Sequence, residues 1–585
     1  SIGRLNIYKK IFKLSWFMIG EIGRKEIQEK PLDWWQTAVF YQIYPRSFKD
    51  SDGDGIGDLN GITEKLDYLK DLGIGAVWLS PIYRSPMADF GYDISDFMEI
   101  DPLFGNFIDF DNLQRKAKDL GIKIILDFVP NHSSNQHEWF LKSARREEPY
   151  TDFYIWADGK IDPVSGERLE PTNWLSVFRG SAWTWNEQRQ QYYLHHFAVE
   201  QPDLNFRNPV VVNEMKNVIQ FWLDKGVDGF RMDAIPYLFE SPYLADEESS
   251  GNPNAKPGDY SNLIHSLTQN LLETYDMITQ WRALLDAKTA EDNITRLMMI
   301  EAYADLEEAI GYYGTETKPG GHFPFNFLFI NDLNNESTAF DFRDTVNQWM
   351  SHMSEGRWAN WVIGNHDQHR VASRYGSELI DSLNMLALLL PGSAITYNGE
   401  EIGMEDGFVS WNDTKDPAGI NAGEERYLIL SRDPARTPFQ WDNSTSAGFS
   451  ENSTTWLPVS SNYKTLNLEH EMAAEKSHYK VYKKLIQARQ TPTIQRGNLN
   501  TYTFSDNVFA FSRTLEKNEI FVVIVNLGFQ NEQVNLHQAF QNLPDNLYVY
   551  TASVHSTCNS GDKLPTADIT LKCKEGLVLR STLSS

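Results

Sequence analysis

Residues 227–234 read VDGFRMDA, a short apolar run that ends abruptly in charged side chains. Short apolar runs of this kind are typical of strands buried on both faces, as in a parallel sheet. Barrel enzymes hold their reacting groups at the C-terminal ends of such strands. Three further stretches share the pattern: IILDFVPNH (residues 124–132), LMMIEAY (residues 297–303) and WVIGNHD (residues 361–367). We therefore expect Asp233, Glu301 and Asp367 to meet at one mouth of a barrel.

Strand-like and helix-like segments alternate from about residue 39 to residue 490. Helical spacing of apolar residues is clearest at residues 66–72 and 110–120. The expected strands are residues 39–48, 76–82, 124–128, 228–233, 297–303, 323–327, 358–364 and 394–398. Eight strands with intervening helices predict the α/β class and a (β/α)8, or TIM, barrel.

One connection is too long for a simple turn. Residues 133–227, between the third and fourth expected strands, are rich in Trp, Tyr, Pro and Asn, which predicts a small inserted domain. From about residue 493, short alternating strands predict an antiparallel β-sandwich. The expected division is an N-terminal extension (1–32), a catalytic barrel (33–132 and 204–490), an inserted domain B (133–203) and a C-terminal β domain (491–585).

Composition restricts the function. The net charge of −27 argues against nucleic acid as a partner, because phosphate binding needs a positive surface. Aromatic residues make up 13% of the chain, a supply that suits the flat faces of sugars. Lys9, Lys10 and Lys13 surround a short apolar stretch, residues 14–19, that resembles part of a signal peptide. No stretch is long and apolar enough to predict a transmembrane helix.

Two further features accord with a secreted glycoprotein. Cys558 and Cys573 lie close together in sequence, and a disulfide between them would close a loop worth about 3 kcal/mol in the chain-entropy model. A reduced pair of thiols is the alternative. Asn131 has a glycosylation signal but lies inside a strand-end motif, so we expect it to be buried. The other signals are at Asn293, Asn335, Asn412, Asn443 and Asn452.

The strand-end residues suit the splitting of a glycosidic bond, which needs one carboxyl to protonate the leaving oxygen and another to attack or stabilise the anomeric carbon. Asp233 is the candidate nucleophile. Arg231, two residues earlier on the same face, should keep Asp233 ionised and orient it. Glu301 follows the apolar run LMMI, and an apolar setting raises a carboxyl pKa, as a general acid requires. A plain Asp–Arg ion pair is the structural alternative.

Two histidines accompany these carboxylates. His366 precedes Asp367, and the pair either forms a structural hydrogen bond or grips sugar hydroxyls. Asp127, Asn131 and His132 form a second polar group that either supports the nucleophile or binds hydroxyls. The sequence offers no ligand spacing that would make these histidines a catalytic metal site.

A separate acidic stretch, KDSDGDGIGDLNG, covers residues 49–61. Its alternating carboxylates match the first positions of a calcium loop of the EF-hand type. Gly61 stands where such a loop has its last Glu, and a strand rather than a helix precedes the stretch. We expect a structural Ca²⁺, or Mg²⁺, on Asp50, Asp52, Asp54, the Ile56 carbonyl and Asp58. An acidic surface turn without a metal is the alternative.

With these motifs placed, the chain resembles glycoside hydrolase family 13, the α-amylase family. The similarity is greatest to its oligo-1,6-glucosidase and α-glucosidase branch, which includes the insect maltases. The resemblance runs from about residue 34 to the C-terminus. It rests on DFVPNH (127–132), GFRMDA (229–234), IEAY (300–303), GNHD (364–367) and, in the inserted domain, QPDLN (201–205).

The resemblance implies roles for single residues. Asp233 becomes the nucleophile, Glu301 the acid/base and Asp367 the transition-state stabiliser. Sugar contacts are implied for His132, Arg231 and His366, and Asp93 would hold the non-reducing glucose. An arginine of SRDPARTPFQW (431–441) would assist Asp93; we favour Arg436 over Arg432. A retaining reaction would place the Asp233 and Glu301 carboxyls about 5–5.5 Å apart.

The resemblance therefore predicts a secreted, retaining, exo-acting α-glucosidase, a monomer or a homodimer, with small oligosaccharides as substrates. Ala234 resembles the small residue of α-1,4 cleavers, where α-1,6 cleavers have Val, and so favours maltose, sucrose and short malto-oligosaccharides. The same residues would serve an α-1,6-glucosidase, a transglycosylase or a sucrose isomerase. A non-catalytic amino-acid transporter heavy chain, which shares the barrel, is the alternative of another class.

Overall fold

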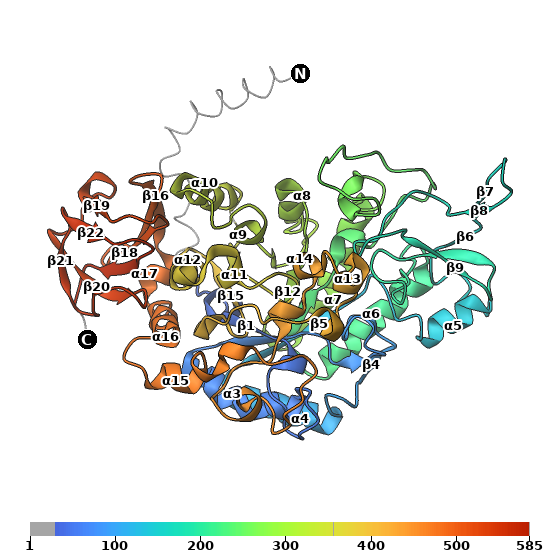
Figure 1. Cartoon of the computed structure of the whole chain (residues 1–585), viewed down its shortest axis with the longest axis horizontal. Coiled ribbons are helices and arrows are strands. Elements are labelled where there is room, and N and C mark those ends of the chain that lie inside the picture. The colour runs from blue at the N-terminus through green and yellow to red at the C-terminus, as the bar shows by residue number, and fades with distance from the viewer. Residues whose placement is uncertain (1–29, 355, 584–585) are drawn as a thin grey trace, which may run out of the picture.

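The computed structural model describes residues 30–354 and 356–583. The signal-like stretch at residues 14–19 lies outside these ranges. Within them, no helix has both the length and the apolar character that crossing a bilayer requires. The chain forms a central barrel, with the inserted segment at one end of the long axis and the C-terminal strands at the other (Figure 1).

Eight parallel strands form the barrel, as predicted. They follow one another around the sheet in chain order, and the sheet is open only between the sixth and seventh strands, β13 and β14. There the Asn360 side chain bridges the gap, because its amide donates to the Pro324 carbonyl (2.7 Å) and accepts from the Asn326 N–H (2.8 Å). In chain order the strands are β1 (Val39–Ile43), β2 (Ala76–Leu79), β5 (Lys123–Phe128), β11 (Gly229–Met232), β12 (Leu297–Ile300), β13 (Phe323–Pro324), β14 (Asn360–Val362) and β15 (Ser393–Tyr397).

The strands are shorter than their apolar runs. The first ends at Ile43 rather than at residue 48, because Pro45 lacks an N–H and begins a 3₁₀ turn, η2 (Pro45–Ser47). The sixth is limited to two residues and ends at Pro324 for the same reason. The polar residues beyond each strand therefore lie in loops at the barrel mouth rather than in the sheet.

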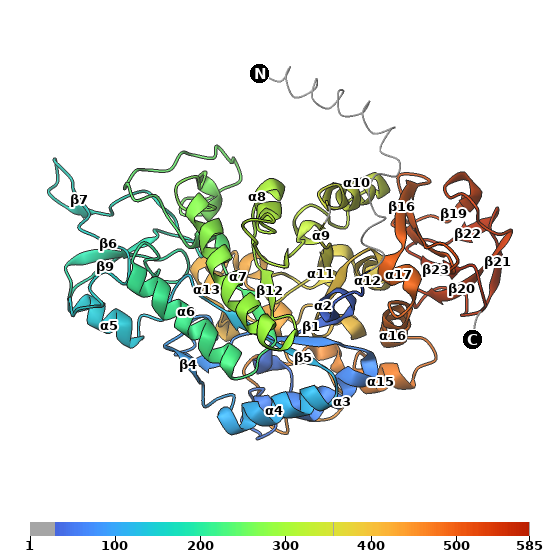
Figure 2. The ribbon, with the colours of Figure 1, turned by 180° about the vertical axis from the view of Figure 1, so that it is seen from behind.

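Helices surround the barrel on the outside (Figures 1 and 2). The two helices that the spacing predicts begin earlier than expected, since Asp58 caps the first and Asn106 caps the second. The main helices are α3 (Leu59–Leu72), α4 (Phe107–Asp119), α6 (Pro209–Asp224), α7 (Leu272–Asp292), α8 (Leu306–Gly311), α10 (Ala339–Met350), α12 (Ile380–Leu389) and α16 (His478–Ala488).

The long connection after β5 has a core of its own. It contains α5 (Glu138–Ala144), a three-stranded antiparallel sheet and a small hairpin, and Trp174 and Trp183 are buried in its centre. The sheet consists of β6 (Trp156–Ala157), β10 (Gln191–Leu194) and β9 (Trp183–Asn186), and the hairpin of β7 (Lys160–Ile161) and β8 (Arg168–Leu169).

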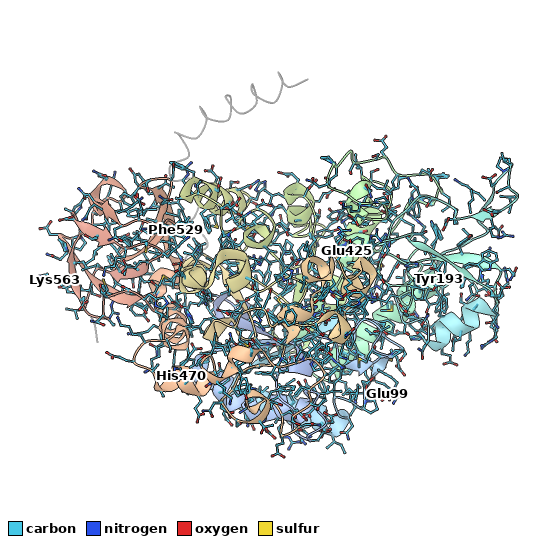
Figure 3. The ribbon with its side chains drawn as sticks, viewed as in Figure 1. Glu99, Tyr193, Glu425, His470, Phe529 and Lys563 are labelled. Atoms are coloured by element: carbon cyan, nitrogen blue, oxygen red, sulfur yellow. The ribbon has the colours of Figure 1, made fainter. Side chains whose placement is uncertain are left out.

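The C-terminal strands form the expected antiparallel β domain. A short ribbon of β19 (Glu532–Val534) and β22 (Ile569–Leu571) packs its apolar residues against the same core as the main sheet. In Figure 3 the labelled Phe529 and Lys563 belong to this domain. Its main sheet contains, in spatial order, β16 (Asn498–Thr503), β17 (Val508–Thr514), β18 (Phe521–Asn526), β23 (Gly576–Arg580), β20 (Asn546–Ala552) and β21 (Lys563–Pro565).

The expected disulfide is not formed. Cys558 and Cys573 are both free thiols. Hydrogen bonds close the segment between them instead, because the Ser556 hydroxyl donates to the Glu575 carboxylate and the Lys572 ammonium donates to the Thr557 hydroxyl (2.9 Å). The reduced pair is thus the state of this structure.

Candidate active site

Four side chains from three neighbouring strands meet at the barrel mouth; we call Asp127, Arg231, Asp233 and Glu301 the strand cluster. Arg231 is its centre and is only 1% exposed. Its Nη1 donates to both oxygens of Asp127 (3.0 and 3.1 Å) and to Asp233 Oδ1 (2.6 Å). Its Nη2 donates to the Glu301 carboxylate. Three carboxylates therefore share one guanidinium.

Strand register brings these residues together. Arg231 of β11 is aligned with Asp127 of β5 in the parallel ladder. The Asp233 N–H donates to the Phe128 carbonyl (2.8 Å), and the Glu301 N–H donates to the Met232 carbonyl (2.9 Å). The backbone thus continues the ladder by one residue and turns both carboxylates into the mouth, as the sequence predicts.

The strand cluster has three carboxylates and one arginine, and this excess of negative charge favours protonated carboxyl groups. Burial is the main cause that raises the pKa of both Asp233 and Glu301 to about 8, and neighbouring carboxylates add to the effect. The same burial raises the pKa of Asp127 to about 7. The rise expected for Glu301 is confirmed. The expectation that Arg231 would keep Asp233 ionised at low pH is wrong, because one guanidinium does not offset burial and two neighbouring negative charges.

A second set of charges lies near the first, since Asp367 interacts electrostatically with Asp233 and Glu301. We call Asp89, Asp367, Asp416, Arg432 and Arg436 the loop cluster. Arg432 donates to Asp367 Oδ1 (3.0 Å), to Asp89 Oδ1 (2.8 Å) and to both oxygens of Asp416 (2.6 and 3.0 Å). Arg436 donates from Nη2 to Asp367 Oδ1 (3.1 Å). Burial opposes ionisation of Asp367, but His366 and the two arginines outweigh it and hold its pKa below the usual value.

The neutral ring of His366 links the loop cluster to the barrel. Burial lowers the pKa of His366 well below its usual value. Gln42 Nε2 can only donate, so at 2.7 Å it makes His366 Nδ1 the acceptor and leaves the proton on Nε2, 3.5 Å from Asp367 Oδ1. The ring is stacked against Tyr92 (5.2 Å between centroids) and Tyr44 (5.6 Å). His366 is therefore a fixed donor toward Asp367.

His132, the other predicted histidine, has both ring nitrogens in contact with groups of the protein. His132 is 2% exposed, and burial lowers its pKa to about 4, so it is neutral near pH 7. Its Nε2 lies 2.9 Å from the Tyr92 carbonyl and its Nδ1 lies 3.1 Å from Asn131 Nδ2. Asn131 is buried, as predicted, and also donates to Asp203 (3.2 Å).

Asp93 does not lie in either cluster. It is fully buried, and its carboxylate accepts from the Ser85 hydroxyl (3.0 Å) and from the N–H groups of Ala88 (2.8 Å) and Asp89 (2.9 Å). It thus fixes the turn that presents Asp89, and Asp89 is the carboxylate that contacts Arg432. We preferred Arg436 as the partner of Asp93; the structure instead pairs Arg432 with Asp89 (2.8 Å).

Several residues of the site were not predicted from the sequence. Trp78 and Tyr92 donate to Asp127 Oδ2 (3.3 and 2.9 Å). Phe178 and Phe197 of the inserted segment pack edge to face, and Phe197 packs in the same way on Tyr237. The Arg432 guanidinium lies over the Phe178 ring (4.7 Å). Only the abundance of aromatic residues in the long connection pointed to these contacts, and it did not indicate which rings make them.

Ala234, directly after Asp233, has a left-handed backbone (φ 51°, ψ 35°). Its N–H donates to Glu301 Oε1 (3.2 Å). A β-branched residue is strained in this conformation. The small side chain at this position therefore has a backbone reason in addition to any effect on substrate choice.

The acidic loop packs beside the N-terminus of α3. Asp50, Asp52 and Asp58 each place one carboxylate oxygen within 4.8 Å of the others. Asp58 also caps α3 by accepting from the Gly61 N–H (2.8 Å). Asp54 accepts from the Ile56 N–H (2.8 Å), and burial with its acidic neighbours raises its pKa to about 6. Three of the four carboxylates that the sequence predicts as ligands therefore lie together, and Asp54 lies outside this group.

Comparison with known proteins places the chain in a family. The family model for the α-amylase catalytic domain matches residues 42–497. Maltase A1 of Drosophila melanogaster is 50% identical over 96% of this chain and 97% of its own length. The amino acid transporter heavy chain SLC3A1 of Rattus norvegicus is 39% identical, over 96% of this chain and 80% of its own. The crystal structure of the α-glucosyl transfer enzyme XgtA is 33% identical, with a TM-score of 0.82, and covers 94% of this chain and all of its own. The fold, the strand-end carboxylates and these matches agree, and the chain belongs to the α-amylase family of glycoside hydrolases.

Proposed function

We propose that the protein is a retaining, exo-acting α-glucosidase that releases terminal α-1,4-linked glucose from maltose, sucrose and short malto-oligosaccharides. The observation that carries this proposal is the strand cluster, in which Arg231 joins Asp127, Asp233 and Glu301 opposite Asp367. The similarity to a maltase over nearly the whole chain supports it.

The geometry supports a two-step displacement. Asp233 and Glu301 both have a raised pKa, and the reactive form has the proton on Glu301 and the ionised Asp233 beside Arg231. Glu301 donates its proton to the glycosidic oxygen while the Asp233 carboxylate bonds to the anomeric carbon. The leaving sugar departs with the proton. Glu301 then takes a proton from water as the water oxygen bonds to the anomeric carbon, and the bond from that carbon to Asp233 breaks, which restores the carboxylate. Asp367, kept ionised by Arg432 and Arg436, stabilises the positive charge that develops on the ring.

The loop cluster supports exo-action. Arg432 pairs with Asp89 (2.8 Å) and with Asp367 (3.0 Å), and Phe178 of the inserted segment lies over its guanidinium (4.7 Å). Charged groups that hydrogen-bond the hydroxyls of one sugar ring in this way favour a terminal glucose. The test offers purified protein an aryl α-glucoside, maltose, sucrose and isomaltose. We expect glucose from the first three, initially as the α-anomer. Absence of glucose from all four contradicts the proposal.

Two alternatives have specific support. The similarity to an α-glucosyl transfer enzyme favours transglycosylation, which would appear as new oligosaccharides at high sucrose. The similarity to a transporter heavy chain favours a non-catalytic subunit, which would release no glucose from any of the four compounds. Faster release from isomaltose than from maltose would contradict the preference that we derive from Ala234.

For the acidic loop we propose a structural Ca²⁺ held by Asp50, Asp52, Asp54, Asp58 and the Ile56 carbonyl. Hard oxygen donors are the ligands that Ca²⁺ prefers, and three of the carboxylates already lie close together. Binding at one hundred times the Kd would stabilise the fold by about 2.7 kcal/mol. We expect Ca²⁺ to raise Tm after chelation and Asp52→Asn to remove the effect; an equal response to Mg²⁺ would assign the site to that ion.

We also propose that the protein is a secreted glycoprotein. Asn293, Asn335, Asn412 and Asn443 are exposed, whereas the Asn452 side chain is partly buried and donates to the Gly53 carbonyl (3.1 Å). Enzymatic deglycosylation of protein secreted by eukaryotic cells should reduce its mass, and peptide mapping should find glycans at the four exposed positions. Unmodified peptides at all four would contradict the proposal.

A further inference from the structure

Three segments that are far apart in sequence meet at Asp259; we call Arg179, Asp259 and Arg426 the rim clasp. Asp259 Oδ1 accepts from Arg179 Nε (3.2 Å) and from Arg426 Nη1 (3.1 Å), and Oδ2 accepts from Arg426 Nη2 (3.1 Å). Arg179 belongs to the inserted segment, Asp259 to the connection between β11 and α7, and Arg426 to the connection between α13 (Pro417–Ala422) and α14 (Tyr427–Leu430). In Figure 3 the labelled Glu425, next to Arg426 in the chain, marks the connection between α13 and α14.

The two arginines of the rim clasp are close in sequence to residues of the site. Arg179 follows Phe178, whose ring lies 4.7 Å from the guanidinium of Arg432. Arg426 precedes Arg432 by six residues in a loop whose base is closed by the bond between Asp416 and Arg432. A shorter link between the same two segments is the hydrogen bond from Asn421 Nδ2 to the Phe178 carbonyl (3.1 Å). The rim clasp therefore joins the segment that carries Phe178 to the segment that carries Arg432.

Asp259 is itself held in place by its own loop. Its Oδ2 accepts from the Lys256 N–H (2.8 Å), and the Gly180 N–H donates to the Gly258 carbonyl (2.9 Å). The neighbouring Tyr260 ring is stacked on His265 with 3.6 Å between the ring centroids. The Asp259 side chain is 13% exposed. The Arg426 and Arg179 side chains are more exposed (30% and 38%), so the bidentate geometry and the backbone supports of Asp259, rather than burial, distinguish this group from a mobile surface ion pair.

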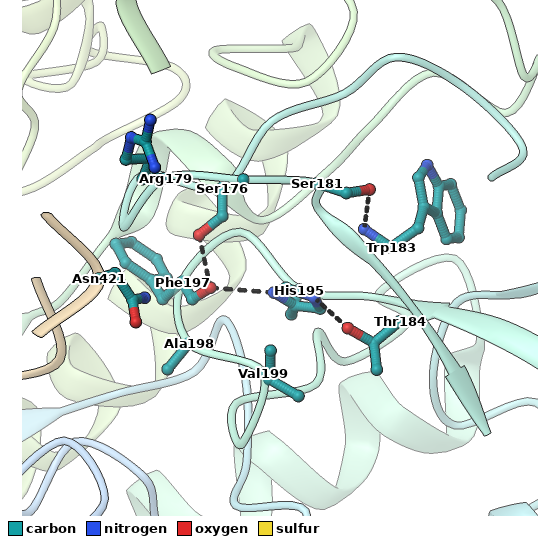
Figure 4. A pocket seen from close by; sticks show the side chains of 11 residues that line it. Ser176, Arg179, Ser181, Trp183, Thr184, His195, Phe197, Ala198, Val199 and Asn421 are labelled. Carbon is teal, nitrogen blue, oxygen red and sulfur yellow. Dashed lines mark hydrogen bonds between the residues drawn. The ribbon is translucent and has the colours of Figure 1, made fainter. Parts of the chain in front are cut away.

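A pocket borders the segment that carries Phe178. Figure 4 shows a pocket next to the clasp, lined by Ser176, Arg179, Thr184, His195, Phe197 and Asn421 among others. The polar groups around it bond one another: the Ser176 hydroxyl donates to the Phe197 carbonyl (2.6 Å), and His195 bonds the same carbonyl (2.9 Å) and the Thr184 hydroxyl (2.8 Å). Because the pocket borders this segment, the hydrogen bonds from Arg179 to Asp259 and from Asn421 to the Phe178 carbonyl are among the contacts that hold it.

We propose that Asp259 is a positioning residue that sets the separation between Phe178 and Arg432 and thereby the fit of the terminal glucosyl unit. This inference rests on the proposed α-glucosidase function. The strand cluster is fixed by the barrel ladder and does not touch the clasp. Loosening the clasp should therefore weaken binding in the ground state and the transition state alike, which raises KM and leaves kcat nearly unchanged.

The test compares Asp259→Asn with Asp259→Glu and with the matched control Asp276→Asn. Asp276 forms an ion pair with Lys318 on the surface, with both side chains more than half exposed. For maltose we expect Asp259→Asn to raise KM about tenfold with kcat within about twofold of wild type. Asp259→Glu keeps the charge and should recover most of the loss, and the control should match wild type.

Double variants test the proposed coupling. Asp259→Asn is combined with Arg426→Gln or with Arg179→Gln. If Asp259 links the two segments that carry Phe178 and Arg432, each double variant should raise KM by much less than the product of the single effects. An Asp259→Asn variant with KM within twofold of wild type contradicts the proposal, whatever its Tm. A fall in kcat at unchanged KM contradicts it as well.

A maltose dissociation constant for each variant, measured by calorimetry on a Glu301→Gln background, tests the clasp apart from the reaction. A wild-type protein that releases no glucose would contradict the proposed function. Even then, the ratio of the maltose dissociation constants with and without Asp259→Asn would test the rim clasp. We expect about tenfold weaker binding with Asp259→Asn. A ratio near one would overturn it.

Discussion

Two mostly buried arginines each contact three carboxylates at the barrel mouth, yet the two groups differ in charge. Arg231 is the only cation of the strand cluster, whose carboxylates are Asp127, Asp233 and Glu301. Arg432 shares the loop cluster with Arg436, which also contacts Asp367. The first group therefore has an excess of two negative charges and the second an excess of one.

The charge difference separates the chemical roles. Burial raises the pKa of Asp233 and Glu301 to about 8, so the strand cluster holds protons near pH 7. In the loop cluster the arginines help hold the pKa of Asp367 and of Asp416 below the usual value, although burial raises that of Asp89. One cluster can therefore donate a proton, while the other presents a permanent negative charge to a cationic transition state.

The largest effect should come from the strand cluster. Asp233→Asn removes the attacking oxygen, and we expect kcat for maltose to fall on the order of 10⁴-fold. Steady-state kinetics measures the loss, and an unchanged circular dichroism spectrum would exclude unfolding as its cause. Activity within tenfold of wild type would show that Asp233 is not the nucleophile.

The next effect compares the two arginines of the loop cluster. Arg432→Lys cannot reproduce the contacts to Asp89, Asp367 and Asp416 together, and we expect kcat/KM to fall about 10²-fold. Arg436→Lys loses one contact to Asp367 and should cost about tenfold. Equal losses, or a larger loss for Arg436→Lys, would restore Arg436 as the main partner.

The strand cluster was predictable because its members follow apolar runs on neighbouring strands. Parallel pairing aligns Arg231 with Asp127, and the ladder carries Asp233 and Glu301 to the same mouth. A sequence pattern contains all of that information. The eight strands and the C-terminal sheet were predictable for the same reason, although proline ends β1 and β13 earlier than apolarity suggests.

The loop cluster was not predictable in detail. Asp89 and Arg432 are 343 residues apart, and no periodicity relates them. Asp89 and Asp93 differ only in which side of one turn their carboxylates face, which three hydrogen bonds to Asp93 decide. Such choices depend on tertiary contacts, so the sequence indicated this turn but not that Asp89 is its residue that contacts Arg432.

Stability should respond in opposite directions in the two clusters. The folded pKa of Asp233 lies above its unfolded value, so its contribution is present below about pH 4 and is lost as pH rises toward 8. Asp233→Asn should therefore raise the free energy of unfolding at pH 8 by about 1–2 kcal/mol, with little gain at pH 4. Asp367→Asn should lower it at pH 8, since the folded pKa of Asp367 is depressed. Urea unfolding at both pH values measures this; stabilisation by both variants would contradict the charge difference.

The smallest effect concerns the pH profile. Because the carboxylates of the strand cluster repel one another, removing one charge should make the remaining protons easier to lose. Asp127→Asn should therefore move the basic limb of kcat/KM, expected near pH 8 from Glu301, to lower pH by about one unit. Asp228→Asn is the matched control, because Asp228 is a largely buried carboxylate just before β11 that bonds the Ile124 N–H (2.9 Å) away from the mouth. A basic limb that moves equally in both variants, or upward in Asp127→Asn, would show that shared charge in the strand cluster does not set the protonation of the acid.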